Sequence, residues 1–163
     1  MSSILPEGAQ RVQQFLSREA SLLQVQLLRE STATAREAAE ALGVAVHEIG
    51  KSIVFGSGEN IIVAIVAGDQ RVDADALASV LKIDRPSKLK PDSIKSRLGY
   101  VIGGVSPFDL PIDVKIIIDS YLYSLPMCFV AAGHPRAVVR TSGPQLVELT
   151  HAVVRSIAES AHE

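Results

Sequence analysis

The sequence predicts a single α+β domain built on a mixed β-sheet, and three observations support this class. The chain has 163 residues, of which 47% are hydrophobic and 21% charged, enough to bury one substantial core but not a second. Helical patterns and β-branched apolar runs follow one another without the strict alternation of a doubly wound nucleotide-binding fold. No internal repeat, low-complexity tract or linker divides the sequence. We therefore expect residues 1–163 to form one domain.

The first half of the chain predicts two helices, a short strand and a β-hairpin. Apolar residues recur with helical spacing from Pro6 to Ser21, and the stretch from Leu22 to Leu28 alternates loosely, as a short strand does. The segment TAREAAEALG predicts a helix with Thr32 or Thr34 as its N-cap and Gly43 at its end. The runs SIVF and NIIVAIVAG, separated by the turn GSGEN, predict a hairpin in the middle of the sheet.

The second half predicts three helices, three strands and one long shaped loop. The segments DADALASVLK and PDSIKSRLG have helical patterns, and the basic stretch IDRPSKLK between them reads as a loop. Three glycines and two prolines from Gly99 to Pro111 exclude a regular element there. The runs VKIIID, MCFVAA and RAVVRT predict strands, with a short turn at Tyr121 and Tyr123, before a final helix from about Gly143 to Ala158.

Composition and motifs exclude several classes of protein. The apolar runs are too short to cross a bilayer, and the start MSSILPEGAQRVQQF lacks the pattern of a signal peptide, so a cytoplasmic protein without membrane contact is expected. The lone Cys128 lies in an apolar run, which indicates a buried core residue rather than a disulfide or a zinc ligand. The four histidines are scattered, so we expect neither a metal site nor a cofactor; they are His47, His134, His151 and His162.

Two features remain as candidates for chemistry, because the P-loop, GxSxG, HExxH and dinucleotide-binding signatures are all missing. Lys51 stands at the start of the apolar run SIVF, where it could be a strand-end lysine reaching for water or a fixed positive charge for a phosphate or carbonyl. The stretch GGVSP, Gly103 to Pro107, could be an ordinary tight connection or a loop that aims backbone amides at an oxyanion.

The order and spacing of five segments resemble the YbaK/prolyl-tRNA-synthetase-associated editing domain. They are TAREAAEALG, HEIGKSIVF, IIVAIVAGDQRVD, GYVIGGVSPFDLPIDVKIIID and FVAAGHPRAVVRTSGPQLVELT, and together they cover roughly Thr32 to Ala158. The resemblance implies an α+β fold whose mixed, mostly antiparallel central sheet is flanked by helices. It also implies a free-standing hydrolase that removes a wrong amino acid from the acceptor end of a mischarged tRNA. An aminoacyl-tRNA synthetase or an elongation factor is a further candidate partner.

The resemblance also implies roles for individual residues. Lys51 would hold the terminal adenosine or its phosphate, while Gly103 and Gly104 would orient the acyl carbonyl for attack by a positioned water, with no metal and no covalent intermediate. An apolar wall would select the amino acid by size. The residues expected to bind the substrate are Ile53, Phe55, Val105, Ser106, Pro107, Phe108 and His134.

A basic cluster offers a place for RNA on a chain whose net charge is −2. It comprises Arg85, Lys88, Lys90, Lys95 and Arg97. These side chains could contact acceptor-stem phosphates, or they could form an ordinary solvated loop and helix face.

Two departures from the family bear on the substrate. Alanyl-tRNA editors carry Asn-Leu-Phe after the lysine, whereas Lys51 is followed by Ser-Ile-Val-Phe, which disfavours that subgroup. The cysteinyl-tRNA deacylase YbaK has an aspartate in the penultimate strand, near the place of Val138 here, which argues against cysteine as the substrate without excluding it. Two alternatives to an active editor remain: a catalytically silent module that binds a nucleotide or a tRNA 3′ end, and a protein partner of a synthetase.

Overall fold

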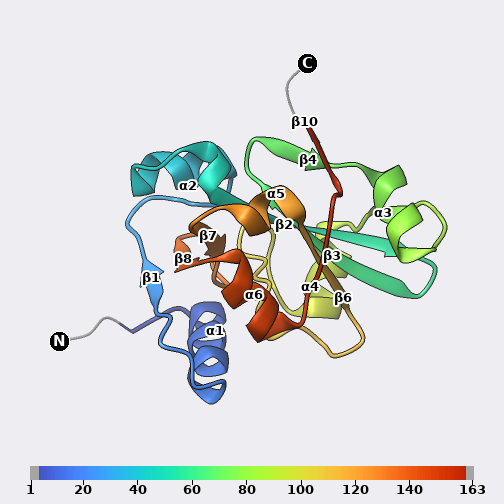
Figure 1. Cartoon of the computed structure of the whole chain (residues 1–163). Helices are drawn as coiled ribbons and strands as arrows, with labels where there is room; N and C mark the ends of the chain where they lie inside the picture. Colours follow the sequence, from blue (N-terminus) through green and yellow to red (C-terminus); the bar gives the residue numbers. More distant parts are fainter. Residues whose placement is uncertain (1–3, 161–163) are drawn as a thin grey trace.

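The computed structural model describes residues 4–160, and within them an eight-stranded sheet forms the centre of the molecule, as Figure 1 shows. Its strand order is β1-β8-β7-β2-β3-β6-β9, with β5 paired to β2, and a separate two-stranded sheet joins β4 and β10. The strands are β1 Val25–Leu27, β2 Ile49–Ser57, β3 Asn60–Ala67, β4 Gln70–Val72, β5 Ser87–Lys88, β6 Lys115–Asp119, β7 Cys128–Ala131, β8 Ala137–Thr141, β9 Val153–Arg155 and β10 Ala158–Ser160. The long β2–β3 hairpin and the β1–β8, β7–β8 and β2–β5 pairs are antiparallel, while β2–β7, β3–β6 and β6–β9 are parallel. The predicted α+β class with a mixed, mostly antiparallel sheet is confirmed.

Helices flank the sheet and begin at residues suited to cap them. Of the two expected N-caps, Thr34 is the one used, in a capping box with Glu37, and Asp73 and Ser142 accept backbone hydrogen bonds at two later helices. Within residues 4–160, no helix combines the length and apolar character needed to span a membrane. The helices are α1 Glu7–Arg18, α2 Ala35–Leu42, the 3-10 helix η1 Val46–Glu48, α3 Ala74–Leu81, α4 Pro91–Leu98, α5 Ser120–Ser124 and α6 Gly143–Thr150.

The two faces of the sheet are covered differently. On one face, α1, α4, α5 and α6 pack over Val63, Ile65 and Ile118 to form the largest apolar cluster. On the other face, α3 covers one part of the sheet through Leu77, whereas α2 covers another part in a separate cluster with Phe129. Between the α2 and α3 clusters, the second face has a stretch that no helix within residues 4–160 covers.

The middle of β2 has a partner along only one edge. On one side, β3 pairs with it from Gly50 to Ser57. On the other side, β7 pairs only at Ile49 and Gly50 and β5 only at Phe55 and Gly56. In the part of the chain that the structure describes, residues 51–53 therefore have no strand neighbour on that edge. The uncovered stretch of the second face and this gap in the sheet meet at the same place.

Three parts of the structure differ from the sequence prediction. The expected turn at Tyr121 and Tyr123 is the short helix α5, capped by Asp119, whose side chain accepts from the Tyr121 N–H at 3.0 Å. The last helix ends at Thr150 rather than Ala158, because His151 adopts a left-handed conformation with φ of 61°, and the chain continues as β9 and β10. The basic loop also contributes a two-residue strand, β5. Asp119 fixes the new path, since its carboxylate accepts from the N–H groups of residues 157 and 158.

Candidate active site

A cavity of about 370 Å³ lies where the uncovered stretch of the sheet meets the unpaired edge of β2. Its walls come from β2 and β7, from the segment that leads into α2, and from the loop that follows α4. Aliphatic and small side chains dominate the lining, and the volume lies in the range of small-molecule sites. The residues that line it are Thr32–Ala35, Ala38, Ile49–Val54, Lys88, Leu89, Ile94, Ile102, Gly103, Val105, Phe129–Ala131 and Val138.

Lys51 is the first charged group of the cavity, and it is half-buried rather than free in solvent. Its ammonium donates a hydrogen bond to the backbone carbonyl of Gln70, which begins β4. An ammonium has three N–H donors, so two remain for a ligand. Desolvation lowers the pKa of Lys51 from 10.5, Lys88 lowers it further, and the nearby carboxylate of Asp69 acts in the opposite direction.

Lys88 is the second charged group of the cavity. Sequence analysis placed it in the basic cluster for acceptor-stem phosphates, but its side chain lines the same cavity as Lys51. The register explains this, because β5 pairs antiparallel with β2 and sets Lys88 opposite Phe55, four residues beyond Lys51. Two like charges beside one apolar cavity repel each other, and an anion bound between them would relieve that repulsion.

The glycine loop contributes Gly103 and Val105 to the cavity, but not Gly104. The N–H of Gly104 already donates to the carbonyl of Val101 at 3.0 Å, so it is not available to an oxyanion. Among the described residues, no acceptor takes the N–H of Gly103 or of Val105. The amides that could serve a ligand are therefore those of residues 103 and 105, where 103 and 104 were expected.

Gly104 has a different task, which is close packing of backbone on backbone. A Cβ at this residue would lie 2.8 Å from the backbone nitrogen of His134 and 3.1 Å from the carbonyl carbon of Gly133. Gly133 in turn is pressed against Gly8 of α1, where a side chain on either residue would overlap the other's carbonyl oxygen. Three glycines thus let α1, the loop after β7 and the loop after α4 stack directly on one another.

The other expected substrate-binding residues divide into two groups. Ile53 and Val105 line the cavity, and their role in substrate binding stays a prediction. The others do not line it. Phe55 is buried under α3, and Ser106 and Phe108 are fully buried. Pro107 lines a separate cavity of about 560 Å³, and His134 is half-buried, with its Nδ1 accepting from the Arg136 N–H at 3.1 Å. Phe55 shares the face of Lys51, but α3 covers that end of the strand.

The rest of the basic cluster stays at the surface. Arg85 forms an exposed ion pair with Asp75 of α3, with 3.2 Å between Nε and Oδ1. Lys90 precedes α4, and Lys95 and Arg97 are exposed in its last turn, beside the cavity wall that Ile94 provides. No group of His, Cys, Asp or Glu side chains suited to a metal occurs within residues 4–160, and His162 lies outside the described part.

Two polar residues next to Lys51 were not identified as candidates from the sequence. Ser52 lines the cavity, and its hydroxyl is buried without a hydrogen-bond partner among the described residues. Gln70 anchors the Lys51 ammonium through its backbone and has a side-chain carbonyl oxygen that is likewise buried and unpaired. The only available signal was the polar pair Lys51-Ser52 at the head of an apolar strand, because the approach of Gln70 depends on the β3–β4 turn.

A small α+β domain with two lysines at an apolar cavity, closed by a glycine loop with free amides, is suited to bind an anionic ligand that carries an apolar or acyl group. Comparison with known proteins makes this class specific. Residues 29–149 match the model of the aminoacyl-tRNA editing domain, so the chain belongs to that family.

Several relatives agree with this assignment. The chain is 30% identical over 125 residues to the uncharacterized protein YwhH of Bacillus subtilis, covering 76% of this chain and 79% of that protein. It is 30% identical over 118 residues to the multifunctional Ser/Thr-tRNA deacylase ProXp-y of Escherichia coli, covering 70% of each. A solved structure described as a candidate trans-editing enzyme for prolyl tRNA synthetase has a TM-score of 0.88 and 32% identity, over 96% of this chain and all of that one.

Proposed function

We propose that the chain is an aminoacyl-tRNA deacylase that acts in trans on mischarged tRNA, with its reaction in the cavity beside Lys51. The observation that carries the proposal is the convergence of Lys51, Lys88 and the free amides of Gly103 and Val105 on one apolar cavity. Family membership supports the reaction class, and ProXp-y, a Ser/Thr-tRNA deacylase, is 30% identical over most of its length.

The two ammoniums are suited to the phosphate and ribose at the tRNA 3′ end. Lys51 retains two N–H donors after its bond to the Gln70 carbonyl, and its stem lies against the apolar wall. Lys88 lies nearer the surface, on the path by which a single strand would enter. A backbone phosphate held between them would make charge-assisted hydrogen bonds to both ammoniums, with Lys51 the less solvated of the two.

The loop amides are suited to the acyl group. Gly103 and Val105 flank Gly104 in the sequence. Each of these two residues lines the cavity. Donors that point at the carbonyl oxygen would stabilise the negative charge that develops there when water attacks the ester. The ester of an aminoacyl-tRNA is already activated, so positioning and charge stabilisation can supply much of the acceleration.

Apolar groups set the limits of the amino-acid side chain that the cavity accepts. Ile49, Ile53, Val105, Phe129 and Val138 surround it, and none offers a hydrogen bond from its side chain. Such a wall rejects large side chains by overlap but separates neighbours in size only weakly. We therefore expect small uncharged amino acids as substrates, and the apolar Val138 gives the cavity no carboxylate at the position where YbaK has one.

A screen with charged tRNAs tests the proposal. Purified protein should release free amino acid from at least one tRNA mischarged with Ala, Ser, Thr, Cys or a small non-protein amino acid. Lys51→Ala should lower the rate on the best substrate by roughly a hundredfold or more, because a charge that contacts the reacting end is lost. Lys115→Ala, an exposed lysine on β6 outside this cavity, is the matched control and should keep the parental rate. A Lys51→Ala rate within about twofold of the parent would refute the site.

One observation favours a second function, a binding module without turnover. None of the residues that line the cavity is Asp, Glu or His, so the described residues present no general base there. Such a module would bind a non-hydrolysable aminoacyl-adenosine analogue with an affinity that depends on Lys51 and would hydrolyse no charged tRNA. Deacylation of any member of the panel by the parent protein would exclude this alternative.

A further inference from the structure

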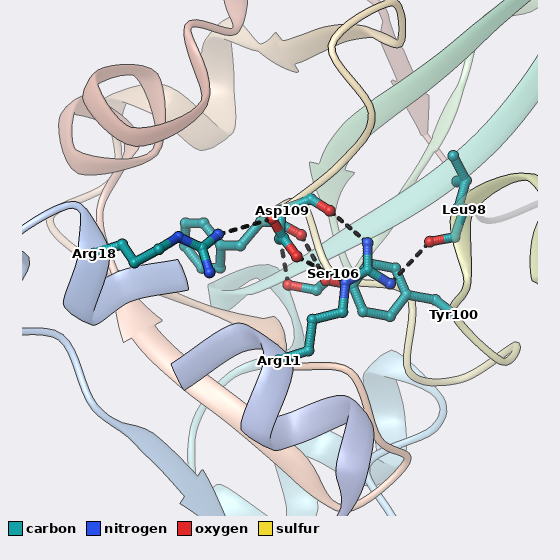
Figure 2. A network of polar contacts seen from close by, with 7 residues as sticks. Arg11, Arg18, Leu98, Tyr100, Ser106 and Asp109 are labelled. Carbon is teal, nitrogen blue, oxygen red and sulfur yellow. Dashed lines mark hydrogen bonds and ion pairs between the residues drawn. The ribbon is translucent and has the colours of Figure 1, made fainter. Parts of the chain in front are cut away.

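The N-terminal helix α1 contacts the glycine loop from outside the region that matches the family. The family model covers residues 29–149, whereas α1 runs from Glu7 to Arg18. Its apolar side, with Ala9, Val12 and Leu16, is buried in the main core and fixes the helix in place. Arg11 lies on the adjacent side of the helix and points toward the segment from Leu98 to Asp109, as Figure 2 shows.

One guanidinium ties the two ends of this segment together. Arg11 donates from Nη1 to the carbonyl of Leu98 at 2.9 Å, and from Nε to the Asp109 carboxylate at 2.9 Å. Its Nη2 donates to the backbone carbonyl of Asp109. The segment between these two residues contains the whole stretch from Gly103 to Pro107. The guanidinium presents its N–H donors in a fixed fork, so it can reach all three acceptors at once. A lysine ammonium could not reach them with the same geometry.

The Arg11 guanidinium also lies over the ring of Tyr100. The Arg11 Cζ atom lies 4.0 Å from the ring centroid, a cation–π distance. The Tyr100 hydroxyl donates to the Phe108 carbonyl at 2.6 Å, and the Phe108 N–H donates to the Ser106 hydroxyl at 3.2 Å. Burial, the largest cause, raises the pKa of Tyr100 to about 12, so the hydroxyl keeps its proton and remains a donor. Figure 2 shows these groups as one continuous network.

The loop also contains a conformation that needs external support. Asp109 has a φ of 57°, in the left-handed region that aspartate enters more readily than most residues but less readily than glycine. Its carboxylate is held by Arg11, with 29% of that side chain exposed, and more loosely by Arg18, with 60% exposed and a contact of 3.2 Å. An unusual backbone conformation of this kind persists only where its surroundings determine it.

We propose that Arg11 is a positioning residue that holds the loop from Leu98 to Asp109, and so keeps the amides of Gly103 and Val105 at the cavity. The inference rests on the proposed deacylase function for its catalytic consequence, but the restraint on the loop stands independently of it. Arg11 lies outside the cavity and acts only through the loop. Because α1 precedes residues 29–149, the brace joins the N-terminal segment to the region that matches the family model.

Three variants test the brace. Arg11→Ala removes the fork, Arg11→Lys retains the charge alone, and Arg18→Ala is the matched control, because Arg18 shares the helix and the Asp109 partner but is mostly exposed. Two quantities are measured: kcat and KM on the best charged tRNA, and the amide hydrogen-exchange rates of residues 99–109.

We expect Arg11→Ala to lower kcat roughly ten- to hundredfold with little change in KM, since misplaced amides weaken transition-state stabilisation more than binding. Exchange in residues 99–109 should become about tenfold faster or more. Arg11→Lys should resemble Arg11→Ala, and Arg18→Ala should change each quantity by less than about twofold.

The proposal is overturned if Arg11→Ala leaves loop exchange unchanged, or if kcat stays within about twofold of the parent while exchange accelerates. Should Arg11→Ala fail to fold, Arg11→Lys gives the same test, because it keeps the aliphatic stem and the charge but loses the fork of N–H donors. If the parent deacylates no tRNA, the proposed function fails, and the exchange rates alone then decide whether Arg11 restrains the loop.

Discussion

The substitution Gly104→Ala tests how closely the glycine loop must approach its neighbours. The new methyl carbon would lie 2.8 Å from the His134 nitrogen, 3.0 Å from the His134 Cα and 3.1 Å from the Gly133 carbonyl carbon. Favourable contacts between heavy atoms lie at about 3.5–4.0 Å, so the two backbones must separate by roughly half an ångström or more. Gly133 cannot retreat, because Gly8 of α1 is packed against its other side. The loop itself must move, together with residues 103 and 105.

The expected cost follows from this geometry. Overpacking of this kind destabilises a protein by about 1–3 kcal/mol, and at this chain length each kcal/mol lowers Tm by about 2–4 °C. We therefore expect Tm to fall by about 2–12 °C, measured by circular dichroism. Deacylation of the best charged tRNA should fall roughly ten- to hundredfold, because small displacements of catalytic groups are costly.

A matched glycine separates lost stability from lost geometry. Gly43 ends α2 with φ of 68° and has no atom within 4 Å of a Cβ, so Gly43→Ala adds backbone strain of about 1–2 kcal/mol without a collision. Both variants should lose stability, but only Gly104→Ala should lose activity. If Gly104→Ala kept the parental Tm and rate, the close packing described for this loop would be wrong.

Four further predictions concern the cavity and the core. Lys88→Met should raise the pKa of Lys51, measured by NMR titration of its side chain, because Lys88 is one of the groups that lower it; an unchanged pKa would mean that the two ammoniums do not interact. The unfolded chain binds the Lys51 proton more tightly than the folded one, so the contribution of this residue to stability rises with pH toward 10.5, while the raised pKa values of Tyr100 and Cys128 act in the opposite direction; in chemical denaturation Lys51→Met should therefore lose stability more steeply with rising pH than the parent. Ser52→Ala should stabilise the fold by about 1 kcal/mol, because the buried hydroxyl has no partner among the described residues; a loss of that size would show that Ser52 has one. Cys128 should resist alkylation at pH 8 in the folded protein, since burial raises its pKa to about 12, and rapid labelling without unfolding would contradict this.

Local signals predicted most of the elements, and the misses occurred where distant contacts decide. The hairpin of β2 and β3 and the start of α2 at Thr34 follow from β-branched runs and a capping box. The path after Thr150 could not be predicted in this way, because β9 pairs with β6 and β10 with β4, far away in the sequence. The run of valines at 153 and 154 was the one local hint of a strand.

The candidate site shows the same division. That Lys51 and Gly103 line one cavity agrees with the resemblance to the editing domain, although no periodicity in the sequence predicts it. Phe55 lies on the face of Lys51 by strand alternation, and only the tertiary position of α3 decides that it is covered. Arg11 gave no signal at all, since an arginine on an amphipathic helix usually faces solvent, and its acceptors are about ninety residues away.

The location of the cavity suggests why residues of the candidate site lower the stability of the fold. A sheet normally pairs both edges of an inner strand, yet residues 51–53 of β2 lack a neighbour on one edge in the described structure. A lysine with a lowered pKa and an unpaired serine occupy this gap, and both would be replaced by apolar residues if packing alone mattered. Natural proteins accept such local costs mainly where function requires them. The surrounding structure compensates by restraining the loop that faces the gap, through the glycine stack on one side and Arg11 on the other. Stabilising substitutions at Lys51 or Ser52 should therefore be readily found, and those at Lys51 should abolish the proposed deacylase activity.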